Sequence, residues 1–294
     1  MVSIIIVNYN TSSLLLDCIN SIYRQTRGTT FEIIVADNNS SREQVEMLRN
    51  DERFTLLELS ENVGFGRANN RAAQIAKGDM IFLLNPDTIL LNDAVTILEH
   101  YMYDNMKVGI CGGNLFDENM QPAHSFHRMR PSILSEMDFA AKQIYRKLRF
   151  GSNAQFNHTD RPLAVQMITG ADLMIRHNVW EELQGFDEKF FMYYEDADLC
   201  LRCMQRGYNV VSVPSAMIQH LEGRSFMETK AHCHRILSGR KIFFSKHYSG
   251  PYNMVADILN VVSLSCAVVL SFIVGRRVEQ SNYLTRLKAY IELV

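Results

Sequence analysis

Asn85, Pro86 and Asp87 directly follow an apolar run over residues 80–84. An apolar run of this length that ends beside a proline predicts a short buried strand. An amide and a carboxylate at the carboxyl end of such a strand are hard oxygen ligands, which suit a divalent cation and a phosphate. A polar turn that only ends a strand is the alternative. Polar residues placed in the same way elsewhere in the chain decide between the two.

Polar residues also follow the other strands predicted in the first third of the chain. Since the carboxyl ends of parallel strands meet at one edge of a sheet, we expect these side chains to share one site. The predicted strands span 2–7, 31–36 and 54–59, and they are followed by Asn8-Tyr9-Asn10, by Asp37-Asn38-Asn39 and by the loop Asn62-Val63-Gly64-Phe65-Gly66.

The residue types at this edge fit the parts of a nucleoside diphosphate. The Tyr9 ring can stack on a base, and an ionised Asp37 only accepts hydrogen bonds, as the N3–H of uracil or thymine requires. Gly64 and Gly66 allow an anion to approach the backbone at a helix N-terminus. Asp87 would hold Mg²⁺ or Mn²⁺ that bridges two phosphates. Each residue alone also fits a turn, but their shared edge favours the nucleotide site.

A second group of reactive side chains is Glu195 and Asp196, which follow a run of apolar and aromatic residues at 190–194. An apolar setting raises the pKa of a carboxyl group toward the range that suits a general base. Acidic residues are also favoured at a helix N-terminus, and that interpretation suits Asp198 well. His220 follows a strand-like run, and a lone histidine is more often structural than a ligand.

Alternating strands and helices over residues 1–112 must position the first group. Alternation at this spacing predicts parallel βαβ units with helices on both faces, which is an α/β fold. The helices expected here begin at Ser12 or Ser13 and span 41–48, 68–76 and 94–101, the last capped by Asn92, and a fifth strand spans 108–111.

The pattern is less regular after Gly113. A basic helical piece around 133–149 is expected, followed by a more ordered region. That region has a strand over 165–176 interrupted at Thr169-Gly170, helices over 179–183 and 197–205, a strand over 208–213 ended by Pro214, and a basic helix over 229–247.

Charge is unevenly distributed between the body and the C-terminal part of the chain. Residues 224–294 hold ten Lys or Arg and four Asp or Glu, a net charge of +6, whereas the whole chain of 294 residues carries −2. A basic tail predicts an anionic partner such as a membrane surface, although a solvated helical face explains it equally well. The overall charge gives no reason to expect nucleic acid.

The 17 uncharged residues 258–274 are short for a membrane span, so we expect a helix on a membrane or in a dimer contact.

Cysteine usage and the first residues bear on the compartment. The six cysteines lack the pattern of a disulfide framework, and Cys200 and Cys203 lie too far from His232 and His234 for a compact zinc site. We expect buried thiols in a reducing compartment. An apolar strand that starts at Val2 predicts no cleavable signal peptide. The expected location is cytoplasmic, with peripheral contact at the inner face of the cell membrane.

Taken together, these segments resemble the inverting glycosyltransferases of family 2, especially the rhamnosyltransferase-like branch. The resemblance covers residues 1–247 in the family's order, and as a set the motifs are specific. The matching segments are VSIIIVNYNT at 2–11, IVADNNS at 34–40, NVGFGRANN at 62–70, GDMIFLLNPDT at 78–88, TGADLMIR at 169–176, GFDEKFFMYYEDADLCLR at 185–202 and HLEGRS at 220–225.

The resemblance implies a GT-A fold, which is a Rossmann-like, mostly parallel sheet flanked by helices. It implies a nucleotide-sugar-binding half over 1–112 and an acceptor-binding, catalytic half of the same domain over 113–223. Residues 224–294 are then a basic, helical C-terminal extension.

The resemblance also implies site residues. Asp87 and His220 would hold the metal, with Asn85 in place of the first acid of the family's DxD motif. Asp196, with Glu195 beside it, would be the catalytic base. The residues expected to line the donor are Asn8, Tyr9, Asn10, Asp37, Asn39, Asn62, Gly64, Phe65, Asn70, Asn85, Gly170 and Ala171.

The implied reaction is a single displacement that depends on Mg²⁺ or Mn²⁺. A sugar would pass from a nucleoside-diphosphate donor, either UDP-linked or dTDP-rhamnose-like, to a glycan or lipid-linked acceptor in the synthesis of a cell-surface polysaccharide. Asp196 would take the proton of the acceptor hydroxyl.

Three other functions compete with this reading. A sugar nucleotidyltransferase generally needs basic groups in its first loop, and residues 8–13 have none. A dinucleotide-binding dehydrogenase needs a third glycine where Asn69 stands, and its loop follows the first strand. A degenerate, non-catalytic binding module would not need Asp87, Asp196 and His220 together.

Overall fold

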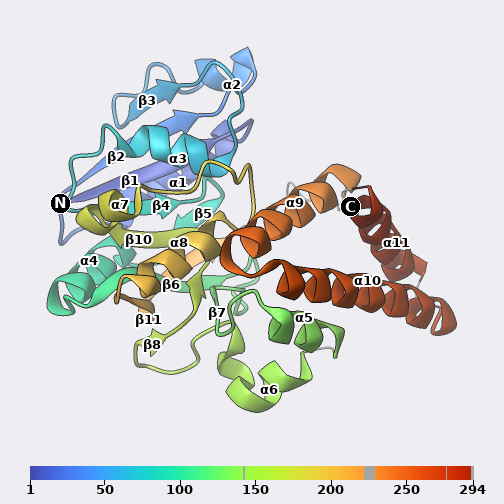
Figure 1. Cartoon of the computed structure of the whole chain (residues 1–294). Helices are drawn as coiled ribbons and strands as arrows, with labels where there is room; N and C mark the ends of the chain where they lie inside the picture. The colour runs from blue at the N-terminus through green and yellow to red at the C-terminus, as the bar shows by residue number, and fades with distance from the viewer. Residues whose placement is uncertain (142, 222–228, 276, 293–294) are drawn as a thin grey trace.

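The computed structural model describes residues 1–141, 143–221, 229–275 and 277–292. Part of the predicted motif at 220–225 therefore lies outside the described residues. One central sheet carries helices on both faces, and three C-terminal helices extend to one side (Figure 1). In chain order the elements are β1 (Val2–Asn8), α1 (Ser12–Gln25), β2 (Phe31–Asp37), α2 (Arg42–Glu46), β3 (Thr55–Glu58), α3 (Phe65–Ala73), β4 (Met80–Leu84), β5 (Thr88–Leu90), α4 (Ala94–Asp104), β6 (Val108–Phe116), β7 (Phe126–His127), α5 (Ile133–Ala140), α6 (Ile144–Phe150), the 3₁₀ helix η1 (Gly151–Ala154), β8 (Leu163–Ala164), β9 (Met167–Ile168), β10 (Asp172–Arg176), α7 (His177–Leu183), α8 (Glu195–Gln205), β11 (Asn209–His220), α9 (Lys230–His247), α10 (Gly250–Ile273) and α11 (Arg277–Ile291).

The main sheet has the strand order β3-β2-β1-β4-β10-β6-β11-β5. Strands β1 to β4 pair in parallel, as the alternation of strands and helices predicts. Successive residues of β1 feed two different cores, because Ile4 and Ile6 pack on one face while Ile5 and Val7 pack on the other. Burial of both faces explains why these strands are continuous apolar runs instead of alternating ones.

Strand β10 runs against the direction of its two neighbours in the sheet. It lies between β4 and β6 and runs antiparallel to both. The residues at the start of β10 therefore lie at the same sheet edge as the end of β4. This reversal brings the segment before β10, which contains Gly170 and Ala171, to the edge where Asp87 lies.

The prediction that Pro214 ends a strand is wrong, because β11 continues through it to His220. The register of β11 against β6 shifts between Ser212 and Met217. A proline lacks a backbone N–H and is tolerated at such an irregularity. Continuation of β11 carries His220 to the edge of the sheet opposite Thr88 of β5.

Other expected elements differ at their boundaries. Asn92 does not cap α4, whose N-cap is Asp93; instead the Asn92 amide bonds the backbone of Ser215 and Met217 in β11. The helical piece expected over 133–149 is two helices, α5 and α6. Helix α3 begins at Phe65, three residues before the predicted start, because Gly64 at φ +88° precedes it.

Helix α9 belongs to the core of the body. Phe243 and Phe244 are fully buried in the same apolar cluster as Ile5 and Phe186. Helix α10 then leads away from the body, and α11 returns along it toward α9 (Figure 1).

A buried arginine joins these helices to α5. The guanidinium of Arg240 donates to Glu136 of α5 at 2.9 Å and to Asp257 of α10 at 2.7 Å. This arginine, counted above as part of a basic tail, is therefore neutralised inside the protein.

Candidate functional site

Asp87 and His220 come together at the edge of the sheet. Asp87 Oδ1 lies 3.2 Å from His220 Nε2, and Asn85 Nδ2 lies 3.4 Å from the same nitrogen. The pairing of β5 with β11 fixes this contact, because β5 begins directly after Asp87 and β11 ends at His220. The sequence alone could not pair residues that are 133 positions apart; the structure brings the two predicted metal ligands together.

The donor atoms of this pair suit Mg²⁺ or Mn²⁺. A carboxylate oxygen and an imidazole nitrogen converge, with Asp87 about one-fifth exposed and so open to a ligand. Within the described part of the chain, no group of three or more His, Cys, Asp or Glu residues could hold a metal ion. For the pair to hold an ion, further ligands such as oxygen atoms of a diphosphate and of water would be needed.

Asp196 lies in the first turn of α8 with part of its surface exposed. Its Oδ1 accepts from the N–H of Ala197 at 2.8 Å, and its Oδ2 accepts from the N–H of Gly170 at 3.2 Å. The turn before α8 is unusual, since Tyr193 and Tyr194 both have positive φ, at +73° and +70°. Non-glycine residues in this region are strained and persist only where packing holds them.

Helix α9 supplies the packing that holds this turn. A side chain at Gly239 would collide with the carbonyl of Tyr193, so glycine is needed for α9 to lie this close. The ring of Tyr194 packs on Phe243 with centroids 5.8 Å apart. The position of Asp196 therefore depends on a helix that follows it by more than thirty residues.

Residues Gly170 and Ala171 link the two reactive groups. The Gly170 N–H donates to Asp196, and the Ala171 carbonyl accepts from the N–H of Asn85 at 3.0 Å. A side chain on Gly170 would lie 3.3 Å from the Phe65 ring, so the glycine keeps this junction compact. The carboxylate of Asp196 and the end of β4 are therefore separated by one dipeptide.

The two neighbouring carboxyl groups of α8 have different surroundings. Glu195 is buried, its Oε2 has no hydrogen-bond partner, and burial together with the charge of Asp196 raises its pKa to about 8. Burial also raises the pKa of Asp196, against backbone hydrogen bonds that lower it. Burial therefore favours the neutral form at Glu195, whereas Asp196 keeps part of its surface exposed.

We predict that Glu195→Gln removes a pH dependence of stability. Because the pKa of Glu195 is raised above its unfolded value, its contribution to stability is complete below about pH 4.5 and is lost as pH rises toward 8. Glutamine cannot ionise, so the free energy of unfolding of the variant should not show this decline. The comparison is urea unfolding at pH 5 and at pH 8.5.

Exposed Glu188 offers a matched control for that comparison. For Glu188→Gln, the free energy of unfolding should change with pH in the same way as for the unchanged protein. If the free energy of unfolding of Glu195→Gln also changes in that way, Glu195 is not held as the neutral acid.

The residues expected to bind the base lie at the ends of β1 and β2. Asn8 and Asp37 are register partners, and Asn8 Nδ2 donates to Asp37 Oδ1 at 2.8 Å. The N–H of Ser40 donates to Asp37 Oδ2 at 2.9 Å. Asn8 and Asp37 are both buried, and the hydrogen bond from Asn8 orients the Asp37 carboxylate. Tyr9 is half exposed beside them, free to stack.

Asn10 and Asn39 shape the turns at this edge. Both have left-handed backbone conformations, with φ of +57° and +65°, which asparagine tolerates better than most residues. Asn10 Oδ1 accepts from the N–H of Ser41 at 2.8 Å and so ties the two strand ends together. Their contact with a donor remains a prediction.

The glycine loop after β3 differs from the expected phosphate cradle. The N–H of Phe65, at the start of α3, donates to the Phe191 carbonyl at 2.9 Å. A side chain on Gly64 would collide with that same carbonyl, so the close approach that glycine permits here is to the protein itself. Asn62 Oδ1 accepts from the N–H of Gly64 at 3.1 Å and fixes the loop.

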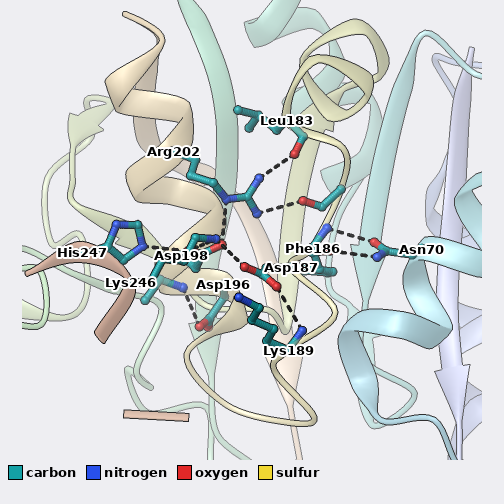
Figure 2. Close-up of polar contacts among 12 residues, drawn as sticks. Asn70, Leu183, Phe186, Asp187, Lys189, Asp196, Asp198, Arg202, Lys246 and His247 are labelled. Atoms are coloured by element: carbon teal, nitrogen blue, oxygen red, sulfur yellow. Dashed lines mark hydrogen bonds and ion pairs between the residues drawn. The ribbon is translucent and has the colours of Figure 1, made fainter. Parts of the chain in front are cut away.

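Asn70 likewise holds the segment that precedes α8. Its amide donates to the Phe186 carbonyl and accepts from the Phe186 N–H, both at 2.9 Å (Figure 2). Gly185 next to it has φ +65° and lies against Asn70 Oδ1. The loop and helix α3 thus anchor residues 185–191, and their place in the donor site stays a prediction.

Sequence reasoning placed Asn38 at this edge but assigned it no role of its own. It is buried, its Oδ1 accepts from the N–H of Val63 at 2.9 Å, and its Nδ2 donates to Asn62 at 3.0 Å. It therefore fixes the glycine loop to the end of β2. The signal for this role was its position between Asp37 and Asn39, together with an amide that can both donate and accept hydrogen bonds.

Asp198 lies in the first turn of α8, as predicted, but it does more there than place an acid at a helix start. It is fully buried and bonds Arg202 Nε at 2.7 Å, His247 Nε2 at 2.7 Å and Lys246 Nζ at 2.8 Å (Figure 2). Burial opposes its ionisation, but the bond from His247 and the charges of Arg202 and Lys246 lower its pKa to about 2. Lys246 also pairs with Asp187 at 2.6 Å.

Arg202 extends this network to the loop before the catalytic residues. Its Nη1 donates to the Leu183 carbonyl at 2.7 Å and its Nη2 to the Gly185 carbonyl at 2.8 Å. The spacing of Asp198 and Arg202, four apart on a helix, was the signal for their pairing. The partners from α9 could not be foreseen from the sequence.

Comparison with known proteins gives one family and several relatives. A profile of the family described as "Glycosyltransferase like family 2" matches residues 1–239. O-antigen biosynthesis protein RfbC of Myxococcus xanthus is 27% identical over 76% of this chain, and the chain spans 17% of its length. Rhamnosyltransferase WbbL of Escherichia coli K12 is 25% identical over 63% of this chain and 74% of its own length. O-antigen chain rhamnosyltransferase RfbN of Salmonella typhimurium is 28% identical over 74% of this chain and 66% of its own.

Two solved structures share the arrangement of elements. The mannosyltransferase PcManGT from Pyrobaculum calidifontis, in complex with GDP-Man and Mn²⁺, has a TM-score of 0.63 over 99% of this chain and 86% of its own. GalNAc-T7 with UDP, GalNAc and Mn²⁺ has a TM-score of 0.59 over 80% of this chain and 47% of its own. Both are 15% identical to it, so they show the fold alone.

Proposed function

The chain belongs to glycosyltransferase family 2 and has the GT-A fold, and from that premise we propose that it transfers a sugar from a nucleoside-diphosphate donor to a glycan or lipid-linked acceptor. The names of the relatives support cell-surface polysaccharide synthesis as the setting and a rhamnose-type sugar as the group transferred. The reaction would be metal-dependent and would invert the anomeric centre.

One observation carries the proposal, namely the dipeptide Gly170-Ala171 that joins Asp196 to the end of β4. A single displacement needs a base on one side of the anomeric carbon and a charge-stabilising group by the leaving diphosphate on the other. The hydrogen bonds from the Gly170 N–H to Asp196 and from the Asn85 N–H to the Ala171 carbonyl hold the two sides of such a site together. A binding module would have no use for a partly exposed carboxylate at this position.

The proposed chemistry follows from the state of the Asp196 carboxylate. Asp196 takes the proton of the acceptor hydroxyl, whose oxygen bonds to the anomeric carbon as the bond from that carbon to the diphosphate oxygen breaks. A pKa above the usual range for an aspartate makes Asp196 a stronger base, while neutral Glu195 avoids a second negative charge beside it. Asp87 and His220 would hold a divalent cation, which when bound offsets the charge of the departing diphosphate.

The donor base is proposed from Asp37. Each oxygen of its carboxylate already accepts one hydrogen bond and keeps a second lone pair. A ring N–H, as in uracil and thymine, complements such an acceptor, whereas cytosine offers none at N3. We therefore propose a UDP-sugar or a dTDP-sugar such as dTDP-rhamnose as the donor.

The acceptor side is proposed to lie in residues 113–223. A hollow of about 290 Å³ occurs within residues 122–158, and His124, Lys147 and Phe156 are among the residues that line it. Residues 125–127 of the same segment contact the Thr169-Gly170 region through the pairing of β7 with β9 and the bond from Thr169 N–H to the Ser125 carbonyl. This connection supports the hollow as part of the acceptor path.

The test is a panel of nucleotide sugars, measured by saturation-transfer NMR and by product formation with and without Mn²⁺. We expect uridine or thymidine donors to bind and those with cytosine not to. Asp87→Asn should lower kcat/KM by about 10²–10³-fold, because a neutral amide is a poor ligand for a hard cation. The product should have the anomeric configuration opposite to that of the donor.

Asp93→Asn is the matched control for Asp87→Asn, since Asp93 lies six residues further on and outside the site. It should leave kcat/KM unchanged. Equal transfer by Asp87→Asn and the unchanged protein would refute the metal assignment. Donor binding with no transfer to any glycan acceptor, in the presence of Mn²⁺, would favour a binding module instead.

A further inference from the structure

Helix α10 presents an apolar stripe to the outside of the molecule. Val255, Ile258, Val262, Val269 and Ile273 are between 44% and 71% exposed, and Cys266 is exposed as well. Their spacing of three and four residues puts all six on one face of the helix. A helix on the surface of a water-soluble body normally shows polar residues on its outer face.

The polar residues of α10 instead face the protein. Asn260 donates to Glu136 of α5 at 2.9 Å, and Asp257 accepts from Arg240 of α9 at 2.7 Å. Ala256 and Leu264 are buried on the same side. Because Asp257 and Asn260 of α10 point toward the protein, the exposed stripe contains no charged or amide group that would favour contact with water. An apolar phase or surface must therefore cover it.

The apolar surface continues onto the neighbouring α5 and α6. Helix α5 packs beside α10, with the hydroxyl of Tyr252 bonded to the N–H of Ile133 at 2.8 Å (Figure 1). Exposed apolar side chains are present on both short helices, and they include Leu134 at 47%, Met137 at 52%, Ile144 at 56% and Leu148 at 83%.

The charge next to these side chains is cationic. Lys147 and Arg149 are exposed on either side of Leu148. The acidic residues of α5 do not offset them, because Glu136 is paired with Arg240 and Asp138 with Arg146. Aliphatic side chains flanked by exposed lysine and arginine match the boundary between acyl chains and anionic head groups.

We propose that α10, with α5 and α6, docks the protein on the surface of an anionic lipid bilayer. The proposal goes beyond the proposed function and does not rest on it. Helix α10 has 24 residues, and an 18-residue stretch of it has a mean hydropathy of 2.0, enough in length and composition to span a membrane. The bonds of Asp257 to α9 and of Asn260 to α5 instead fix the first half of the helix against the protein, so its stripe would lie in the plane of the interface.

A second copy of the chain fits the stripe less well. Helices that pair through a repeat of this kind use charged residues beside the apolar seam to set the register. The positions flanking this seam, such as Leu259 and Val268, are uncharged too. A broad face without charges beside cationic helices suits a lipid surface, because lipid molecules can contact the helix without a fixed alignment.

The single exposed cysteine allows a direct measurement. All six cysteines lie in the described part of the chain, and the five apart from Cys266 are buried. A polarity-sensitive fluorophore on Cys266 should brighten and shift to the blue with vesicles of phosphatidylcholine and phosphatidylglycerol, and much less with phosphatidylcholine alone. Cys266→Ser should take up no label.

Variants separate lipid binding from self-association. Val262→Glu with Val269→Glu should weaken flotation with anionic vesicles by about tenfold or more, because a carboxylate is excluded from the acyl boundary. Lys147→Glu with Arg149→Glu should remove the preference for anionic over neutral vesicles. Met106→Glu, at a 70% exposed position between α4 and β6, is the matched control and should bind as the unchanged protein does.

Two results would overturn the proposal. In the first, the protein does not float with anionic vesicles, and light scattering shows a dimer that the double variant Val262→Glu with Val269→Glu dissociates. That result would assign the stripe to contact with a second copy of the chain. The other is equal flotation with neutral and anionic vesicles, which would contradict the role given to the cations. Neither result depends on whether the protein transfers a sugar.

Discussion

Asp196→Asn should lower kcat by about 10²–10⁴-fold while leaving donor affinity nearly unchanged, because a positioned general base contributes this much to a proton transfer. Asparagine has the same shape and can still accept from the Gly170 N–H, so the junction with the end of β4 should persist. The measurement is steady-state transfer together with calorimetric titration of the donor nucleotide. Transfer that survives in the variant would show that another group removes the proton.

The neighbouring carboxyl group provides the control for Asp196→Asn. Glu195→Gln replaces a buried neutral acid by a neutral amide, and it should retain most of the activity at pH 7. In the unchanged protein the acidic limb of the profile of kcat/KM against pH should lie above the range of an ordinary aspartate, because burial raises the pKa of Asp196. Activity is lost as pH falls through that pKa, since only the ionised form accepts the proton.

Asp198→Asn should lower the free energy of unfolding by about 3–5 kcal/mol, the usual result of removing one partner from a buried ionic network. The change leaves Arg202, Lys246 and His247 facing each other without the carboxylate that they share. Urea unfolding at pH 7 measures the effect. The exposed pair of Glu182 and Arg206 is the control, and Glu182→Gln should change stability by less than about 1 kcal/mol.

The pH dependence of the same carboxylate gives a second check. Its pKa is lowered to about 2, so its contribution to stability is present above the ordinary value near 3.8 and is lost as pH falls from there toward 2. The unchanged protein should therefore lose stability over that window more steeply than Asp198→Asn does. If the unchanged protein and Asp198→Asn unfold in acid at the same pH, the ionic network contributes little to the free energy of unfolding.

Local patterns predicted the strands and the edge of the sheet where the chemistry lies. Residues 80–84 form β4, and Asp87 follows it at the expected edge, because an apolar run and a proline are local signals. The α/β class and the GT-A fold are confirmed. The position of β10 between β4 and β6 was not predictable, since a run of five apolar or buried residues carries no information about its neighbours.

The site was predicted in its residue types and only partly in their contacts. Asp87 and His220 meet, although the histidine alone gave a weak signal. Gly64 and Asn70 were expected to line the donor, whereas the contacts that the structure shows for them are with Phe191 and Phe186. Such contacts depend on how two distant loops fold against each other, which spacing along the chain does not record.

The packing of α9 against the turn at Tyr193 and Tyr194 has a consequence for how the protein is made. Phe243, Lys246 and His247 lie beyond residue 239, where the family match ends, yet they complete the core and the charge network around α8. During synthesis the ribosome releases the turn at Tyr193 and Tyr194 well before it releases these residues. The nascent chain can therefore form strands β1 to β4 early, but the Asp196 carboxylate gains all of its packing only after the last part of α9 has emerged.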